Sequence, residues 1–264
     1  MFFVDTHTHL YLSAFEQDRS QTVERAITAG VNIMLLPNID SKSIEPMLSL
    51  QRQFPSNCLA MMGLHPTSVK ADWEKELRTV EQYLRTGNFH AVGEVGLDFY
   101  WDTTFREEQE TVFYTLASLA LELDLPLVIH SRKSLDDILA LLKRFGKVQW
   151  RGVFHCFPGS VEQARKVTEL GFNLGIGGVV TFPNSTLGSI VREIGLEHVV
   201  LETDAPFISP VPYRGKRNES AYLPIIAQSV AYYTNSTAEK VAAITSQNAF
   251  NLFPTIKKST SCCK

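Results

Sequence analysis

The stretch "LPLVIHSRKSLDDILALLKRFGKVQWRGVFHC", residues 125–156, contains the pattern that decides the fold. The apolar run "LPLVIH" (125–130) precedes a segment with helical spacing of its apolar residues (134–145), and the apolar run "RGVFHC" (151–156) follows. Strands that are apolar throughout, joined by a helix-length connection, are typical of parallel sheets covered by helices. The stretch therefore predicts a strand–helix–strand unit.

The same unit recurs along the whole chain. Strands are predicted at residues 2–5, 31–37, 58–64, 90–95, 125–130, 151–156, 172–178 and 198–204. Helices are predicted at residues 15–29, 42–54, 74–86, 105–123, 134–145, 161–170, 186–195, 219–233 and 237–250. Eight such units in about 250 residues predict an α/β fold of the (β/α)8 TIM-barrel type. A doubly wound open sheet is the alternative. With no linker or repeat in between, we expect one barrel domain over residues 1–255 and a polar C-terminal tail over 256–264.

Composition narrows the class of protein. The chain has 264 residues, 44% of them hydrophobic, and a net charge of −3. Nucleic-acid binding would therefore need a local basic patch. No apolar run approaches the ~20 residues that span a bilayer, and the N-terminus lacks the pattern of a secretory signal. Two cysteines lie in apolar runs (Cys58, Cys156) and two in the tail (Cys262, Cys263), which is no disulfide framework. We expect a cytoplasmic protein without a membrane partner.

Polar side chains follow five of the predicted strands at their C-terminal ends. They are His7, His9, Glu94, His130, His155 and Asp204. The strands of a barrel converge at this end, where active sites are built. If the first strand persists to residue 9, the two histidines of its H-x-H motif project to the same face. Each residue alone has an ordinary structural explanation, but together they predict one site.

The residue types indicate a metal site. Imidazoles and carboxylates suit Zn²⁺, Mn²⁺, Fe or Co, and also Mg²⁺ with water. Six ligands are too many for a single catalytic zinc, whereas two ions that share a bridging carboxylate use them all. We therefore predict two divalent ions, Mg²⁺, Mn²⁺ or Zn²⁺, at the C-terminal end of the strands. The chemistry of such a pair is hydrolysis by an activated water.

Several motifs together resemble one known family. They include "VDTHTHL" (4–10), "GLHP" (63–66), "VGEVGLDF" (92–99), "LPLVIHSR" (125–132), "GVFHCFPG" (152–159) and "LETDAPFISP" (201–210). From residue 2 to about 253 the chain resembles the TatD family of metal-dependent hydrolases. The resemblance implies a two-metal deoxyribonuclease, often a 3′–5′ exonuclease, that acts on single-stranded DNA ends. The family commonly has histidine where this chain has Thr67, a departure that leaves the substrate preference open.

The resemblance also implies a role for each ligand. His7, His9 and Asp204 are expected to hold one ion, His130 and His155 the second, and Glu94 bridges them. Asp204 is the candidate general base, because a carboxylate beside the bridging water can take its proton.

Four further residues are predicted to bind the substrate. His65, before Pro66, could donate to a phosphate or leaving oxygen, although a histidine here could equally cap a turn. Arg132, Arg214 and Lys216, with the neighbouring Arg217, could bind phosphate, although surface ion pairs or a solvated loop would explain them too. His90 and His198 lie at strand starts, the wrong end of a barrel, and are expected to be structural.

Other functions remain open at this stage. A metal-dependent amidohydrolase or lactonase would use similar ligands, but such relatives often bridge their ions with a carboxylated lysine, and Glu94 favours a phosphodiesterase. A non-catalytic barrel would have lost ligands, and none is missing. "GIGG" (175–178) fails the dinucleotide pattern because residue 180 is valine, so tight packing in the strand or a backbone approach to a substrate explains it better. The oligomeric state is open, and a monomer is compatible with these features.

Overall fold

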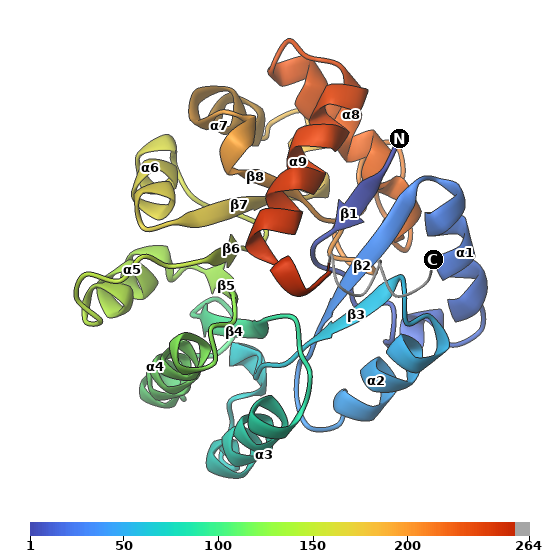
Figure 1. Cartoon of the computed structure of the whole chain (residues 1–264). Coiled ribbons are helices and arrows are strands. Elements are labelled where there is room, and N and C mark those ends of the chain that lie inside the picture. Colours follow the sequence, from blue (N-terminus) through green and yellow to red (C-terminus); the bar gives the residue numbers. More distant parts are fainter. Residues whose placement is uncertain (257–264) are drawn as a thin grey trace.

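The computed structural model describes residues 1–256. Its strands, all paired in parallel, are β1 (Phe3–Asp5), β2 (Val31–Pro37), β3 (Cys58–Met61), β4 (Val92–Asp98), β5 (Leu127–Arg132), β6 (Gly152–Phe154), β7 (Phe172–Ile176) and β8 (Val199–Leu201). The helices surround the strands (Figure 1). Every predicted strand has its counterpart in this set.

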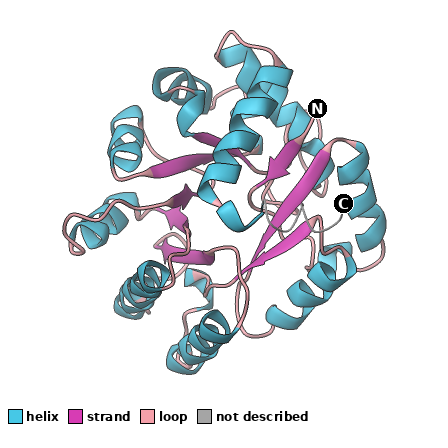
Figure 2. Ribbon diagram, viewed as in Figure 1, coloured by secondary structure: helices cyan, strands magenta, loops and turns pink. Residues whose placement is uncertain are grey.

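Within residues 1–256, one α-helix follows each of the strands β1 to β7, and two α-helices follow β8. Figure 2 shows these helices around the strands. They are α1 (Arg19–Thr28), α2 (Ile44–Gln53), α3 (Trp73–Thr86), α4 (Arg106–Glu122), α5 (Leu135–Lys143), α6 (Val161–Glu169), α7 (Leu187–Ile194), α8 (Leu223–Tyr233) and α9 (Ala238–Leu252). Short 3-10 helices are η1 (Ser13–Phe15), η2 (Pro66–Ser68), η3 (Gly178–Thr181), η4 (Leu196–His198) and η5 (Ser220–Tyr222). The apolar faces of the amphipathic helices pack on the outside of the strands.

The strands follow one another in sequence order around a ring. One ladder joins β1 to β3 and a second joins β4 to β8. A parallel bridge between Met62 and Val92 connects β3 to β4. On the other side, Thr6 N donates to Leu201 O at 3.0 Å, just beyond the end of β1. This order is that of the predicted (β/α)8 barrel and not that of a doubly wound sheet, which reverses its strand order.

The interior of the barrel is a separate apolar core. Side chains that alternate along the strands point inward and form it, among them Val4, Ile33, Leu59, Val128, Val153 and Val200. The end of α9 and the residues after it, including Phe253 and Ile256, pack into the same core. Ile256 was predicted to begin the polar tail, but it is fully buried here. The remainder of that tail, residues 257–264 with Cys262 and Cys263, lies outside the described residues.

Helix α9 closes the N-terminal end of the barrel, and Figure 1 shows it crossing there. Asn248 Nδ2 donates to the carbonyl oxygens of Leu196 (2.7 Å) and Val199 (2.8 Å) at the start of β8. Ser246 Oγ donates to Phe2 O, next to β1, at 3.1 Å. Helix α9 does not cover the opposite end of the barrel, where the strands end and a site can form. Within residues 1–256, no helix has the length and apolarity that crossing a membrane requires.

The first strand ends at Asp5, as predicted, and does not persist to residue 9. The buried Asp5 carboxylate accepts hydrogen bonds from Thr203 N (3.0 Å), Thr203 Oγ1 (2.6 Å) and His7 N (3.3 Å). These bonds join the end of β1 to the segment after β8, and residues 6–9 continue as a loop. His7 and His9 therefore reach the site from a loop and not from one strand face.

Candidate metal centre

The predicted ligands converge at the C-terminal end of the barrel. A cavity of about 650 Å³ opens there, and His9, His65, Glu94, His130, His155 and Asp204 line it. His7 is fully buried behind them. Segments as far apart in sequence as residues 7 and 204 are thus brought to one point by the order of the strands.

Glu94, near the start of β4, contacts histidines on two sides. Its Oε2 lies 3.0 Å from His7 Nε2 and 3.6 Å from His9 Nε2. Its Oε1 lies 2.9 Å from His130 Nδ1 and 3.8 Å from His155 Nε2. One carboxylate thus presents each of its oxygens to a different pair of imidazoles. This is the arrangement that a bridging ligand requires.

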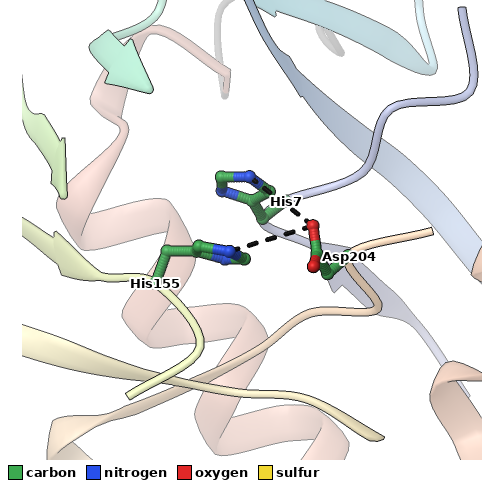
Figure 3. Close-up of side chains that lie close together, drawn as sticks. All are labelled: His7, His155 and Asp204. Carbon is green, nitrogen blue, oxygen red and sulfur yellow. Dashed lines mark ion pairs between the residues drawn. The ribbon is translucent and has the colours of Figure 1, made fainter. Parts of the chain in front are cut away.

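Asp204 faces the histidines from the loop after β8. Its Oδ1 lies 3.5 Å from His9 Nε2, 3.8 Å from His155 Nε2 and 4.0 Å from His7 Nε2. Figure 3 shows the His7 and His155 rings stacked beside this carboxylate, with centroids 3.5 Å apart. His155 therefore lies with His7 and Asp204 as well as facing Glu94, while its ring is 6.4 Å from that of His130. How the ligands divide between two ions stays a prediction.

The charges of the cluster fit a cation. Burial would raise the pKa of Glu94, but His65, His7 and His155 outweigh it and hold that pKa well below its usual range. Burial would lower the pKa of His155, but the carboxylates of Glu202, Asp204 and Glu94 raise it to about 10. The cluster is thus a buried set of carboxylates and imidazole nitrogens that favours positive charge at its centre. Such a donor set suits a divalent metal ion.

Three residues outside the prediction orient the ligand histidines. His9 Nδ1 lies 3.0 Å from the Tyr11 hydroxyl, which donates to Pro37 O at 2.5 Å and so accepts from the ring. Asp98 Oδ2 lies 3.0 Å from His130 Nε2, and Glu202 Oε1 lies 3.0 Å from His155 Nδ1. An acceptor on one ring nitrogen leaves the lone pair of the other for a metal.

Sequence signals for two of these partners exist in hindsight. Asp98 stands four residues after Glu94 and Glu202 stands two before Asp204, both at strand ends. The pattern alone does not say which imidazole each carboxylate faces.

His65 differs from these histidines, because its Nδ1 accepts a hydrogen bond and does not face an acceptor. The backbone N–H of Thr67 donates to His65 Nδ1 at 3.1 Å, so the proton of a neutral ring is on Nε2. That nitrogen lies 3.4 Å from Glu94 Oε1. Burial lowers the pKa of His65 and favours the neutral ring. His65 therefore presents a hydrogen-bond donor, and not a lone pair, to the cavity.

Of the predicted phosphate-binding cations, the structure brings Arg132 into the cavity wall. Arg214 and Lys216 are not among the residues that line it, and they lie over the rings of Phe182 (3.9 Å) and Tyr213 (5.9 Å). Arg217 forms ion pairs with Asp18 and Glu219. The cationic rim expected from these loop residues is therefore not assembled as one patch.

The other motif residues have structural places. His90 Nδ1 lies 2.8 Å from the Thr255 hydroxyl at the opposite end of the barrel, and His198 lies in η4, before β8. The "GIGG" motif makes room for a carboxylate, since a β-carbon on Gly175 would lie 2.3 Å from Glu202 Oε2. This is the tight packing that was one of the two explanations of the motif, and the neighbour is the Glu202 side chain.

Comparisons with known proteins agree with this geometry. The family described as TatD related DNase matches residues 4–254. A metal-dependent hydrolase of Bacillus subtilis named YabD is 34% identical over 250 residues, 94% of this chain and 98% of that protein. A protein of Erwinia tasmaniensis named 3′-5′ ssDNA/RNA exonuclease TatD is 32% identical over 258 residues, with 94% and 98% covered. The crystal structure of YJJV, a TatD homolog from Escherichia coli, superposes with a TM-score of 0.89 at 30% identity, covering 96% of this chain and 98% of that one.

Proposed function

The chain belongs to the TatD-related DNase family, which is a family of metal-dependent hydrolases, and from this premise we propose that it is a phosphodiesterase acting on DNA. The observation that carries the proposal is Glu94, whose two oxygens face different imidazoles. A carboxylate so placed suits two divalent ions, which we propose as the cofactors and which would activate a water and stabilise the leaving oxygen.

The residues around Glu94 have complementary roles in this proposal. Asp204 accepts the proton of the attacking water, because its carboxylate is the exposed acid of the cluster at 13% side-chain exposure. His65 donates from Nε2 to an oxygen of the phosphate, which its tautomer requires. Arg132 supplies a guanidinium to the remaining phosphate oxygens. Arg214 and Lys216 stay candidates for contacts with more distant phosphates.

Single-stranded DNA ends are the proposed substrate, with cleavage from the 3′ end. The support is the name of the Erwinia relative, a 3′-5′ exonuclease for single-stranded DNA and RNA at 32% identity. A site at the bottom of a loop-lined cavity also receives a free chain end more readily than a rigid duplex.

The test uses single-stranded DNA labelled at the 3′ or the 5′ end, with and without a chelator. We expect cleavage that the chelator abolishes, with mononucleotides released from the 3′ end. Asp204→Asn should lose at least about 100-fold of the rate, as loss of a general base does. Asp72→Asn, on an exposed position before α3, should retain it. Chelator-resistant cleavage would refute the proposal, and hydrolysis of lactones or amides without any nucleic-acid cleavage would favour the amidohydrolase alternative.

A further inference from the structure

Two aromatic side chains stand exposed on the rim of the metal cavity. Trp101 has 68% of its surface exposed and Phe207 has 49%, and both line the cavity. Exposing a large ring to water forfeits the free energy that its burial would contribute. Exposed aromatic rings beside a catalytic cavity are therefore candidates for contact with a ligand.

The two rings come from opposite sides of the barrel. Trp101 lies in the loop between β4 and α4, and Phe207 lies in the loop after β8. In a ring of eight strands in sequence order, β4 and β8 are four strands apart in either direction. Glu94 and the ligand histidines lie between these two loops. A molecule bound at the metal centre thus has one aromatic side chain on each flank.

Local contacts hold each ring in place. The Trp101 ring packs edge-to-face on Tyr100, with centroids 4.9 Å apart. The Phe207 ring packs edge-to-face against His9, with centroids 6.0 Å apart. The backbone of Phe207 is fixed as well, since its N–H donates to Asp204 O (2.8 Å) and its carbonyl accepts from Asn218 Nδ2 (2.6 Å). Positioned rings lose little conformational entropy when a flat ligand stacks on them.

A positively charged side chain, Arg132, lies beside Trp101. The Arg132 guanidinium lies over the Tyr100 ring at 4.0 Å and 5.0 Å from the Trp101 centroid. In the part of the chain that the structure describes, no carboxylate forms an ion pair with Arg132, whereas Arg217 and Arg106 are both paired with acids. Its N–H groups are therefore available to an anion from outside the chain, next to an aromatic surface.

We propose that Trp101 and Phe207 form two base-stacking subsites, one on each side of the phosphate held at the metal centre. The inference rests on the proposed phosphodiesterase function and names its substrate more closely. A ligand with a central phosphate and a planar aromatic ring on either side is a dinucleotide step of a nucleic acid. Because the bases of a duplex already stack on one another, these subsites select an unpaired step.

The test compares base-containing with abasic substrates. Two single-stranded oligodeoxynucleotides are used, one of normal sequence and one whose two 3′-terminal residues carry a tetrahydrofuran in place of the base. The wild-type protein should cleave the normal substrate with a kcat/KM at least about tenfold higher, since stacking on one aromatic ring is worth ~1–3 kcal/mol per base. The normal substrate should have the lower KM, because the stacked bases contribute to binding.

Variants then assign this preference to the rings. Trp101→Ala and Phe207→Ala should each reduce the ratio of kcat/KM between the two substrates about tenfold. Trp101→Phe should restore most of it, whereas Trp101→Leu, apolar but without a π-face, should not. Tyr232→Ala, which removes the exposed aromatic ring of α8 far from the cavity, is the matched control and should leave the ratio unchanged.

The outcomes separate the two proposals. If the wild-type protein cleaves DNA in a chelator-sensitive manner but the ratio is the same in Trp101→Ala, Phe207→Ala and the wild type, the stacking subsites are refuted and the phosphodiesterase stands. An equal fall of kcat on both substrates would assign the rings a structural role and also refutes the subsites. If no oligonucleotide is cleaved, both proposals fail together.

Discussion

At the scale of residues, three of the predicted ligand histidines, His9, His130 and His155, each have a partner outside the cluster that sets the orientation of the ring. Glu202 is the most buried of these partners, with no exposed surface, and it lies 3.0 Å from His155 Nδ1. Its Oε1 also accepts from Cys156 N at 2.6 Å. A carboxylate so placed directs the Nε2 lone pair of His155 into the cavity.

We expect Glu202→Gln to weaken divalent-metal binding by about 10- to 100-fold, the usual effect of losing such a partner. The amide is nearly isosteric but does not stabilise the imidazole as a carboxylate does. Titration calorimetry with Mn²⁺ or Zn²⁺ measures the affinity, and Glu197→Gln, on an exposed position of η4, is the control. Unchanged affinity in Glu202→Gln would contradict the assigned orientation.

The convergence of the predicted ligand residues could be expected from the sequence, because each lies in or shortly after an apolar strand segment. Their partners could not, because a partner is defined by distance between strands. Asp98 and Glu202 carry no pattern that names His130 or His155. The position of Arg217 was equally hidden, since its partner Asp18 lies 199 residues away in the sequence.

At the scale of elements, strand β7 is built around a side chain of its neighbour. A β-carbon on Gly175 would lie 2.3 Å from Glu202 Oε2, whereas one on Gly177 would meet nothing closer than 3.6 Å. These two of the three glycines in the motif thus differ in the space available for a β-carbon. Only the first is required by the metal site.

Gly175→Ala should therefore displace Glu202 and have the same effect as Glu202→Gln. Activity and metal affinity should both fall about tenfold or more. Overpacking of this kind also costs about 1–3 kcal/mol of stability. Gly177→Ala is the matched control and should retain both properties. Metal titration and thermal unfolding of the two variants measure the difference, and equal behaviour of both would show that the space beside Glu202 is not limiting.

Helix α9 depends on one amide for its docking at the start of β8. Asn248→Ala leaves the carbonyls of Leu196 and Val199 without their donor, so we expect a loss of about 1–3 kcal/mol in the free energy of unfolding. Gln247→Ala, one position earlier, removes a bond only to Asn251 on the exposed face and should cost less than about 0.5 kcal/mol. Urea unfolding measures both, and similar values would refute a special role of Asn248.

Most boundaries of these elements followed from periodicity and from the length of the apolar runs. The end of the first strand at Asp5 was among them, but the bonds from Thr203 to Asp5 were not, because no local pattern contains them. The position of α9 on the barrel could also not be predicted from the sequence. Its spacing predicted a helix, but only the arrangement of the strands shows which end of the barrel it covers.

At the scale of the whole molecule, stability should depend on pH through a histidine remote from the metal site. Burial lowers the pKa of His90 from 6.5 to about 4. The unfolded chain therefore takes up this proton before the folded chain does. The stability that the folded state has with a neutral His90 is fully present above pH 6.5. It is lost as the pH falls toward 4.

The free energy of unfolding of the wild type relative to His90→Asn should fall between pH 7 and pH 4 by on the order of 2 kcal/mol. One pKa unit corresponds to about 1.4 kcal/mol, and the partial exposure of His90 reduces the sum. Using the difference between the two proteins removes the titration of the metal-site histidines. Chemical unfolding across this pH range makes the measurement, and a difference that does not change with pH would refute the assignment.

Because α9 covers the N-terminal end of the barrel, the metal cavity opens at the C-terminal end of the strands. Phe253 and Ile256 fill the far end of the interior, so nothing that enters from the metal side passes through. Under the proposed exonuclease function, the product leaves along the path by which the next portion of substrate arrives. Product release and substrate entry then compete, and the shortened chain withdraws after each cleavage. Such an enzyme acts distributively, and product release sets its rate at high substrate concentration.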